Sequence, residues 1–151
     1  MDIRTEKVLS YIRRAAVVAE NSPDLETKVG AVLISKKTGS VISEGYNGFA
    51  RKTRDDLLPK TRPDKYKFVI HAEANLIYNA ARNSVGTDEC FTVQTHSPCV
   101  HCARALYQCG ITTVYYKEYY KGTDEVQDLG DLKLIYTAFD QYTRVDITPA
   151  T

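Results

Sequence analysis

Apolar residues recur along the chain with the period of a helix in some segments and of a strand in others. From Val8 to Ala19 they follow helical spacing, with charged side chains on the other faces, so residues 4–20 are predicted to form an amphipathic helix. Two short apolar runs, 29–34 and 41–46, flank a turn that contains lysine and glycine. This arrangement predicts two strands joined as a hairpin.

The second half of the chain continues the alternation. Ser97 is a good N-cap and Pro98 a good first helical residue, so a helix is expected to begin here. The elements expected after residue 70 are a helix over 72–82, a strand over 90–95, a helix from Pro98 to about Gln108, a strand over 111–116, a weak helix over 124–129 and a fifth strand over 132–136. The last fifteen residues show no clear pattern. Helices that alternate with strands predict an α/β fold with a helix-covered sheet.

Length and composition limit the possible functions. A chain of 151 residues is expected to form one domain, 1–151. No apolar run approaches the roughly 20 residues that a membrane-spanning helix needs, and the first residues lack a signal-peptide core. We therefore expect a cytoplasmic protein without a membrane partner. The formal charge of +1 does not indicate a polynucleotide-binding protein.

Residues 48–68 differ from the rest of the chain. They carry seven basic and three acidic residues, two prolines and little periodicity. This segment is either a solvated surface loop or an excursion that closes over a phosphorylated ligand. The sequence favours neither interpretation over the other.

Two short motifs, His71-Ala72-Glu73 and Pro98-Cys99-Val100-His101-Cys102, carry the candidate chemistry. Without a signal peptide, the cysteines are expected to be reduced thiols available for metal ligation. His71, Cys99 and Cys102 are ligands that zinc prefers, and three protein ligands leave a fourth position for water. Glu73 is close to a ligand without being needed as one, so it is predicted to transfer protons during catalysis.

The expected helix starts suit this chemistry. Cys99 and Cys102 are three residues apart and project from one side of a helix, where the positive end of the helix dipole favours thiolate. His71 and Glu73 would point about 200° apart inside a regular helix. They can converge only if His71 precedes the regular part of its helix.

Other interpretations of the motifs remain open. A structural zinc site normally uses four protein ligands, and no fourth is obvious near either motif. A redox Cys-x-x-Cys pair leaves His71 and Glu73 without a role. A zinc-stabilised regulatory module that is not an enzyme would have no use for Glu73.

The two motifs resemble the H-x-E…P-C-x-x-C signature of zinc-dependent nucleobase deaminases. Beyond the motifs, the chain resembles the deoxycytidylate (dCMP) deaminases, especially the phage type, of the cytidine deaminase-like superfamily. The stretches that carry this narrower resemblance are Val29-Gly30-Ala31-Val32, Gly45-Tyr46-Asn47-Gly48-Phe49, Asp55-Asp56-Leu57-Leu58-Pro59, His71-Ala72-Glu73-Ala74-Asn75 and Ser97-Pro98-Cys99-Val100-His101-Cys102. The alternative within the superfamily is a base deaminase of tRNA or single-stranded DNA, which would need a more basic surface.

The resemblance implies a three-layer α/β/α fold with a mixed five-stranded sheet, and hydrolysis of dCMP to dUMP and ammonia for thymidylate synthesis. It implies a catalytic Zn²⁺ held by His71, Cys99 and Cys102, with Glu73 as proton shuttle. Some relatives bind a second, structural zinc, but this sequence has no cysteine between Gly48 and His71, so one zinc per chain is expected. Asn47 and backbone groups near Ala72 and Ser97 are the implied substrate contacts.

The resemblance also implies a regulated homohexamer, activated by dCTP and inhibited by dTTP. These effectors would bind with Mg²⁺ at a separate site around Gly45, Tyr46, Asn47 and Gly48. After the fourth predicted strand, Lys121 is expected to pair with the 5′-phosphate of the substrate, and Tyr119 or Tyr120 to cover the base. Packing of the strand and loop explains most of the other tyrosines in this run equally well.

Overall fold

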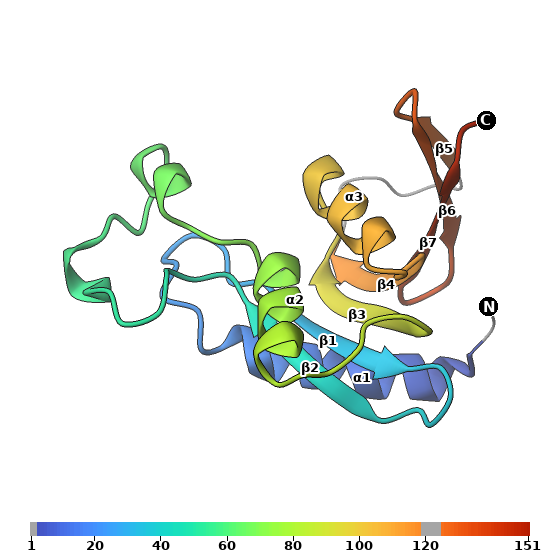
Figure 1. The fold of residues 1–151 in the computed structure, drawn as a ribbon, viewed down its shortest axis with the longest axis horizontal. Helices are drawn as coiled ribbons and strands as arrows, with labels where there is room; N and C mark the ends of the chain where they lie inside the picture. Colours follow the sequence, from blue (N-terminus) through green and yellow to red (C-terminus); the bar gives the residue numbers. More distant parts are fainter. Residues whose placement is uncertain (1–2, 119–124) are drawn as a thin grey trace.

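The structure is a computed structural model, and it describes residues 3–118 and 125–151 (Figure 1). The helices are α1 (Thr5–Ala19), α2 (Ala72–Arg82) and α3 (Val100–Gln108), with short 3-10 helices at Asp55–Leu57 and Asp64–Lys67. The strands are β1 (Gly30–Ser35), β2 (Val41–Tyr46), β3 (Cys90–His96), β4 (Thr113–Glu118), β5 (Glu125–Asp128), β6 (Leu132–Ala138) and β7 (Thr143–Pro149). None of the helices in the described ranges is long and apolar enough to cross a membrane.

The described strands form one mixed sheet with the order β2-β1-β3-β4-β7-β6-β5. Only β3 and β4 pair in parallel, and the helix between them, α3, makes the crossover. The other neighbours are antiparallel, including the predicted hairpin of β1 and β2. The three-layer α/β prediction is confirmed, but the prediction of five strands is wrong because the described sheet has seven.

Both additional strands lie in the C-terminal part of the chain. The segment predicted as a weak helix over 124–129 contains β5, an edge strand whose residues alternate between half-buried and exposed. Its charged side chains suit an edge, where they discourage pairing with another sheet. The last fifteen residues, which showed no clear pattern, contain β7, and β7 lies inside the sheet between β4 and β6.

The two faces of the sheet are covered by different helices. Figure 1 shows α1 along one side of β1 and β2, with α2 on the other side. Since successive side chains of a strand point to opposite faces, Val32 and Ile34 of β1 pack with α1, whereas Ala31 and Leu33 pack with α2 and α3. This double burial explains why β1 is a nearly continuous apolar run.

Two glycines let the helices approach the sheet closely. A Cβ atom on Gly30 would lie 2.0 Å from the backbone oxygen of Ala15 in α1. A Cβ atom on Gly45 would lie 2.5 Å from the backbone oxygen of Ala72 in α2. Neither position has space for a larger residue, so the glycines determine how closely both helices lie against the hairpin.

Candidate metal and active site

His71 lies immediately before the regular part of α2. It is the N-cap residue, and its backbone is extended, with φ −65° and ψ 153°. The prediction that His71 precedes the regular helix is therefore confirmed. The preceding residue, Ile70, is held by two backbone hydrogen bonds with Gly48, of 2.7 and 3.0 Å.

Helix α2 is tied to the edge strand β2 by side chains as well as by the close approach at Gly45. Asn75 and Asn79 donate to the backbone oxygens of Tyr46 and Glu44, at 2.8 and 2.7 Å. These amides satisfy acceptors that the edge strand leaves without a neighbouring strand. The start of α2, with His71 and Glu73, is thereby held in a defined place over the sheet.

The two cysteines lie where β3 leads into α3. The prediction of Ser97 as N-cap and Pro98 as first helical residue is wrong, because the N-cap is Cys99 and α3 begins at Val100. The Cys99 sulfur takes the place of a capping oxygen and accepts a hydrogen bond from the backbone N–H of Cys102, at 3.4 Å. A thiolate suits this position, where helix N–H groups have no helical acceptor.

The three predicted ligands lie together. The Nδ1 atom of His71 is 3.5 Å from the Cys99 sulfur and 3.3 Å from the Cys102 sulfur, and all three ligand atoms are within 4.8 Å of one another. Nitrogen and sulfur ligands of one tetrahedral zinc ion lie about 3.5–3.8 Å apart. The donor set and its spacing therefore fit zinc. No fourth His, Cys, Asp or Glu among residues 3–118 and 125–151 joins this cluster.

Hydrogen bonds between the ligands change their acidity. Hydrogen bonds from the Cys102 thiol and from His71 lower the pKa of Cys99 to about 3. The pKa of Cys102 is raised, because its thiol donates to Cys99 and is buried. The hydrogen bond with Cys99 also raises the pKa of His71. One thiolate is thus favoured within the pair, and thiolate is the form that binds metal.

Glu73 is buried beside these ligands, with 4% of its surface exposed. Burial raises the pKa of its carboxyl group, although hydrogen bonds from its own backbone N–H and from the Gln94 amide partly oppose this. A raised carboxyl pKa suits a group that must both accept and release protons near neutral pH. Gln94 is fully buried in β3. Gln94 was not among the predicted site residues, although a large polar side chain stands out in the middle of a predicted strand.

A cavity of about 130 Å³ adjoins Glu73 and His71. Asn47 and Ala72, two predicted substrate contacts, also line it. The Asn47 amide is largely occupied, because it donates to the Thr27 backbone oxygen at 2.9 Å and accepts from the Val29 N–H at 2.8 Å. The role of Asn47 toward a substrate remains a prediction.

The remaining predicted residues lie in several places. Ser97 is half-buried beside the cysteine motif, whereas Tyr119, Tyr120 and Lys121 are outside the described residues. Among the predicted effector residues, Tyr46 is exposed and Gly48 is buried. Gly45 faces the backbone of α2.

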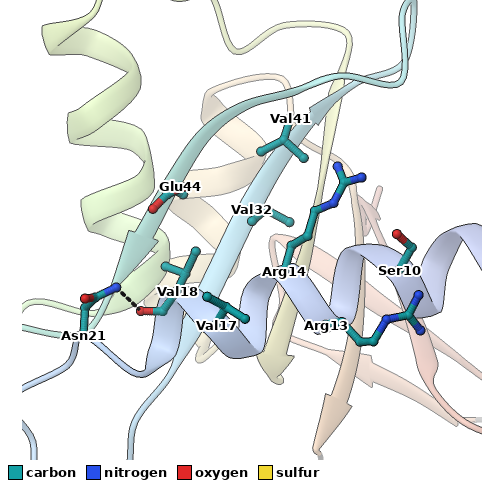
Figure 2. Close-up of a pocket in the computed structure, with 9 residues that line it drawn as sticks. All are labelled: Ser10, Arg13, Arg14, Val17, Val18, Asn21, Val32, Val41 and Glu44. Carbon is teal, nitrogen blue, oxygen red and sulfur yellow. Dashed lines mark hydrogen bonds between the residues drawn. The ribbon is translucent and has the colours of Figure 1, made fainter.

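A separate hollow of about 490 Å³ lies on the opposite side of the sheet from the metal ligands, between α1 and the β1–β2 hairpin. Figure 2 shows Arg13 and Arg14 on α1, and Glu44 across the hollow on β2. Its floor is formed by valines, including Val32. None of the candidate catalytic or metal-binding residues lines this hollow.

The fold and the site together define a protein of the cytidine deaminase-like class: a helix-covered mixed sheet with His-x-Glu and Cys-x-x-Cys at two helix starts. Residues 5–118 match the family of the cytidine and deoxycytidylate deaminase zinc-binding region. The chain belongs to this family.

Named relatives support the membership. The chain is 32% identical to a probable deoxycytidylate deaminase of Drosophila melanogaster over 117 residues, which cover 70% of this chain and 56% of the relative. It is 33% identical to the deoxycytidylate deaminase of Homo sapiens over 122 residues, which cover 76% of this chain and 67% of the relative. The chain thus spans only slightly more than half the length of the Drosophila relative.

A solved structure is also similar. The dCMP deaminase of the cyanophage S-TIM5, in complex with dCMP and dUMP, superposes with a TM-score of 0.66. It is 30% identical in sequence, and the match covers 79% of this chain and 86% of the cyanophage chain.

Proposed function

We propose that this protein is a zinc-dependent enzyme that hydrolyses dCMP to dUMP and ammonia. The observation that carries the proposal is the convergence of His71, Cys99 and Cys102 beside the buried carboxyl group of Glu73. The named relatives and the cyanophage dCMP deaminase support dCMP as the substrate.

His71, Cys99 and Cys102 would hold one zinc ion, since their ligand atoms have the chemistry and spacing that zinc requires. The metal would supply Lewis acidity toward an attacking water molecule. Two thiolates would balance the ionic charge, and a neutral imidazole adds none. The metal and its three ligands would then carry no net charge.

Glu73 acts as the proton shuttle. Its carboxylate accepts a proton from the attacking water and passes it to the ring nitrogen N3 of cytosine while the water oxygen bonds to C4. It then takes the proton of the new C4 hydroxyl and passes it to the amino group, so that the C4–N bond breaks, ammonia leaves and the C4 carbonyl of dUMP forms. Backbone groups near Ala72 and Ser97 hold the carbonyl oxygen and the amino group of the base. Ala72 is suited to this because the N–H groups in the first turn of a helix have no helical acceptor. Asn47, which also lines the cavity, contacts the substrate.

Replacing Glu73 by glutamine tests this assignment, because the amide keeps the size of the side chain and removes the proton transfer. Turnover of dCMP should fall by about 10²–10⁴-fold, with unchanged zinc content and fold. Glu6→Gln, an exposed substitution in α1, is the matched control and should behave like wild type. Substantial activity of Glu73→Gln, or loss of its zinc, would contradict the role. Parallel assays with deoxycytidine, dCTP and single-stranded DNA identify the substrate class.

The substrate phosphate would be bound by Lys121, with Tyr120 over the base. A phosphate dianion in an enclosed site needs charge-assisted hydrogen bonds, and Lys121 follows the parallel strand β4 in the sequence. Ligands of α/β folds collect at the carboxyl ends of such strands.

Regulation by dCTP and dTTP with Mg²⁺ would use a separate site around Gly45, Tyr46, Asn47 and Gly48, in a cytoplasmic homohexamer. The contribution of Gly45 would be indirect, through its contact with α2. A hollow at this end of β2 is lined by Tyr46, Arg51 and Lys52, and also by Asp55 and the ion pair of Arg54 with Asp56. Its aromatic side chain and its cations support a triphosphate there.

A further inference from the structure

A buried lysine lies at the wall of the candidate substrate cavity. The Lys65 side chain is 5% exposed, and its ammonium group is 2.8 Å from the Asp24 carboxylate, whose side chain is 2% exposed. Lysine and aspartate are almost never buried to this extent unless they are paired. Replacing a buried ion pair by apolar residues is often neutral or stabilising, so stability alone does not account for a pair in this place.

The pair belongs to a group of four charged residues, here called the charge clasp: Asp24, Glu26, Arg62 and Lys65. Lys65 also lies 3.3 Å from the Glu26 carboxylate. Glu26 in turn pairs with the Arg62 guanidinium at 3.3 Å and accepts from the Arg62 backbone N–H at 2.6 Å. The clasp joins the segment between α1 and β1 to the C-terminal part of the basic segment 48–68 (hereafter the excursion).

The clasp is in contact with the cavity. Asp24 and Lys65 line the same cavity as His71 and Glu73, together with the neighbouring Tyr66. The hydroxyl of Tyr66 accepts a hydrogen bond from Arg62, at 2.7 Å. On the other side, Asp24 accepts from the side-chain amide of Asn47 at 3.4 Å. The clasp therefore holds two walls of the cavity together.

We propose that Lys65 is a positioning residue for substrate binding in the dCMP deaminase function proposed above. Its ammonium group holds the wall that carries Tyr66 against Asp24 and Glu26, and so gives the cavity the shape that binds the substrate. Lys65 does not bind the substrate phosphate, because two carboxylates already surround its nitrogen.

The residues that carry out the chemistry have anchors of their own, apart from the clasp. Between Lys65 and His71, the backbone pairing of Ile70 with Gly48 holds the chain in place. Helix α2 is anchored independently, since Ser43 donates to the Leu76 backbone oxygen at 2.9 Å and Asn75 donates to Tyr46. Loss of the clasp should therefore weaken substrate binding and leave the catalytic step nearly unchanged.

The test compares Lys65→Met with Lys67→Met. Lys67 is exposed and lies two residues away in the same short helix, so the two variants lose the same charge and the same number of tryptic sites. Lys65→Met should raise KM for dCMP by about tenfold or more, with kcat within about threefold of wild type and equal zinc content. Lys67→Met should match wild type in both constants.

An unchanged KM for Lys65→Met, or equal effects of the two variants, would overturn the inference. A fall in kcat with unchanged KM would also overturn it, because Lys65 would then act on the chemistry. If Lys65→Met does not fold, the double variant Asp24→Asn/Lys65→Met, which leaves no unpaired buried charge, is judged by the same criteria.

A second readout does not depend on activity. Trypsin should cleave between residues 51 and 60 faster in Lys65→Met than in Lys67→Met, because the excursion is no longer held to Asp24. Equal cleavage rates would show that Lys65 does not hold this segment in place, and this result does not depend on whether dCMP is the substrate. Absence of dCMP turnover by the zinc-loaded wild type would refute the proposed function alone.

Discussion

Replacing Gly45 by alanine would test whether the close approach of α2 to β2 positions the catalytic residues. The added Cβ atom would lie 2.3 Å from the Leu76 nitrogen and 2.5 Å from the Ala72 oxygen. Both atoms belong to the backbone of α2, so no flexible side chain can move aside. The helix would have to retreat from the strand.

The size of the retreat follows from these distances. An ordinary contact of a Cβ atom begins at 3.4 Å, so α2 must move by about 1 Å, and forced repacking of this kind typically costs about 1–3 kcal/mol of unfolding free energy. Glu73 moves with α2, while Cys99 and Cys102 stay on α3. A displacement of about 1 Å in a catalytic group can reduce the rate by roughly 10²-fold.

Two glycine controls separate stability from positioning. Gly30→Ala forces a similar retreat of α1, but α1 carries no predicted site residue, so this variant should lose stability and keep kcat per folded molecule. Gly86 has nothing within 4 Å of its Cβ position, so Gly86→Ala should be neutral or slightly stabilising. Urea unfolding measures the stability of each variant. Steady-state turnover is normalised to folded, zinc-loaded protein.

If Gly45→Ala keeps the kcat of wild type while losing stability, α2 moves without disturbing the chemistry, and Gly45 does not position the catalytic residues. If Gly45→Ala is as stable as wild type, the contact with Ala72 and Leu76 is relieved without cost, and the expected retreat of α2 does not occur. A loss of kcat in Gly30→Ala equal to that in Gly45→Ala would show a general effect of destabilisation.

Two further outcomes are expected from the proposed function. Lys121→Ala should raise KM for dCMP far more than KM for deoxycytidine, which lacks the phosphate; an equal effect on both would move the phosphate site elsewhere. Turnover of dCMP should be sigmoidal, become hyperbolic with dCTP and be suppressed by dTTP, because an effector that prefers one state changes the affinity for substrate. Hyperbolic kinetics indifferent to both nucleotides, with Mg²⁺ present, would rule out this regulation.

The sequence was most informative where the physical cause is local. Helix α2 spans Ala72–Arg82, as predicted from its run of helix-forming residues. His71 has the extended backbone that lets its side chain and that of Glu73 point to the same site. The start of α3 was predicted too early because Ser97 and Pro98 match the general preferences for helix starts. The sulfur of Cys99 caps the helix instead, and such a cap is uncommon enough that the general preferences do not predict it.

The missed strands have different physical explanations. In β7, the buried residues Thr143, Val145 and Ile147 alternate with half-buried polar ones, so a period-two signal was present in the sequence. In β5 only Val126 is a large apolar residue. The backbone hydrogen bonds to β6 stabilise this short edge strand. Pairing of this kind depends on a partner strand and leaves little local pattern.

The clasp could not have been predicted from the sequence for a related reason. Asp24 and Lys65 are 41 residues apart, and each lies in a segment of ordinary polar composition. Their pairing depends on the excursion 48–68 folding back toward α1, a contact that no periodicity encodes. The metal ligands, by contrast, could be predicted, because they lie in two short sequence motifs at helix starts. Motif resemblance therefore identifies the ligands and the carboxyl group of this site more directly than the walls of its cavity, which include the long-range pair of Lys65 and Asp24.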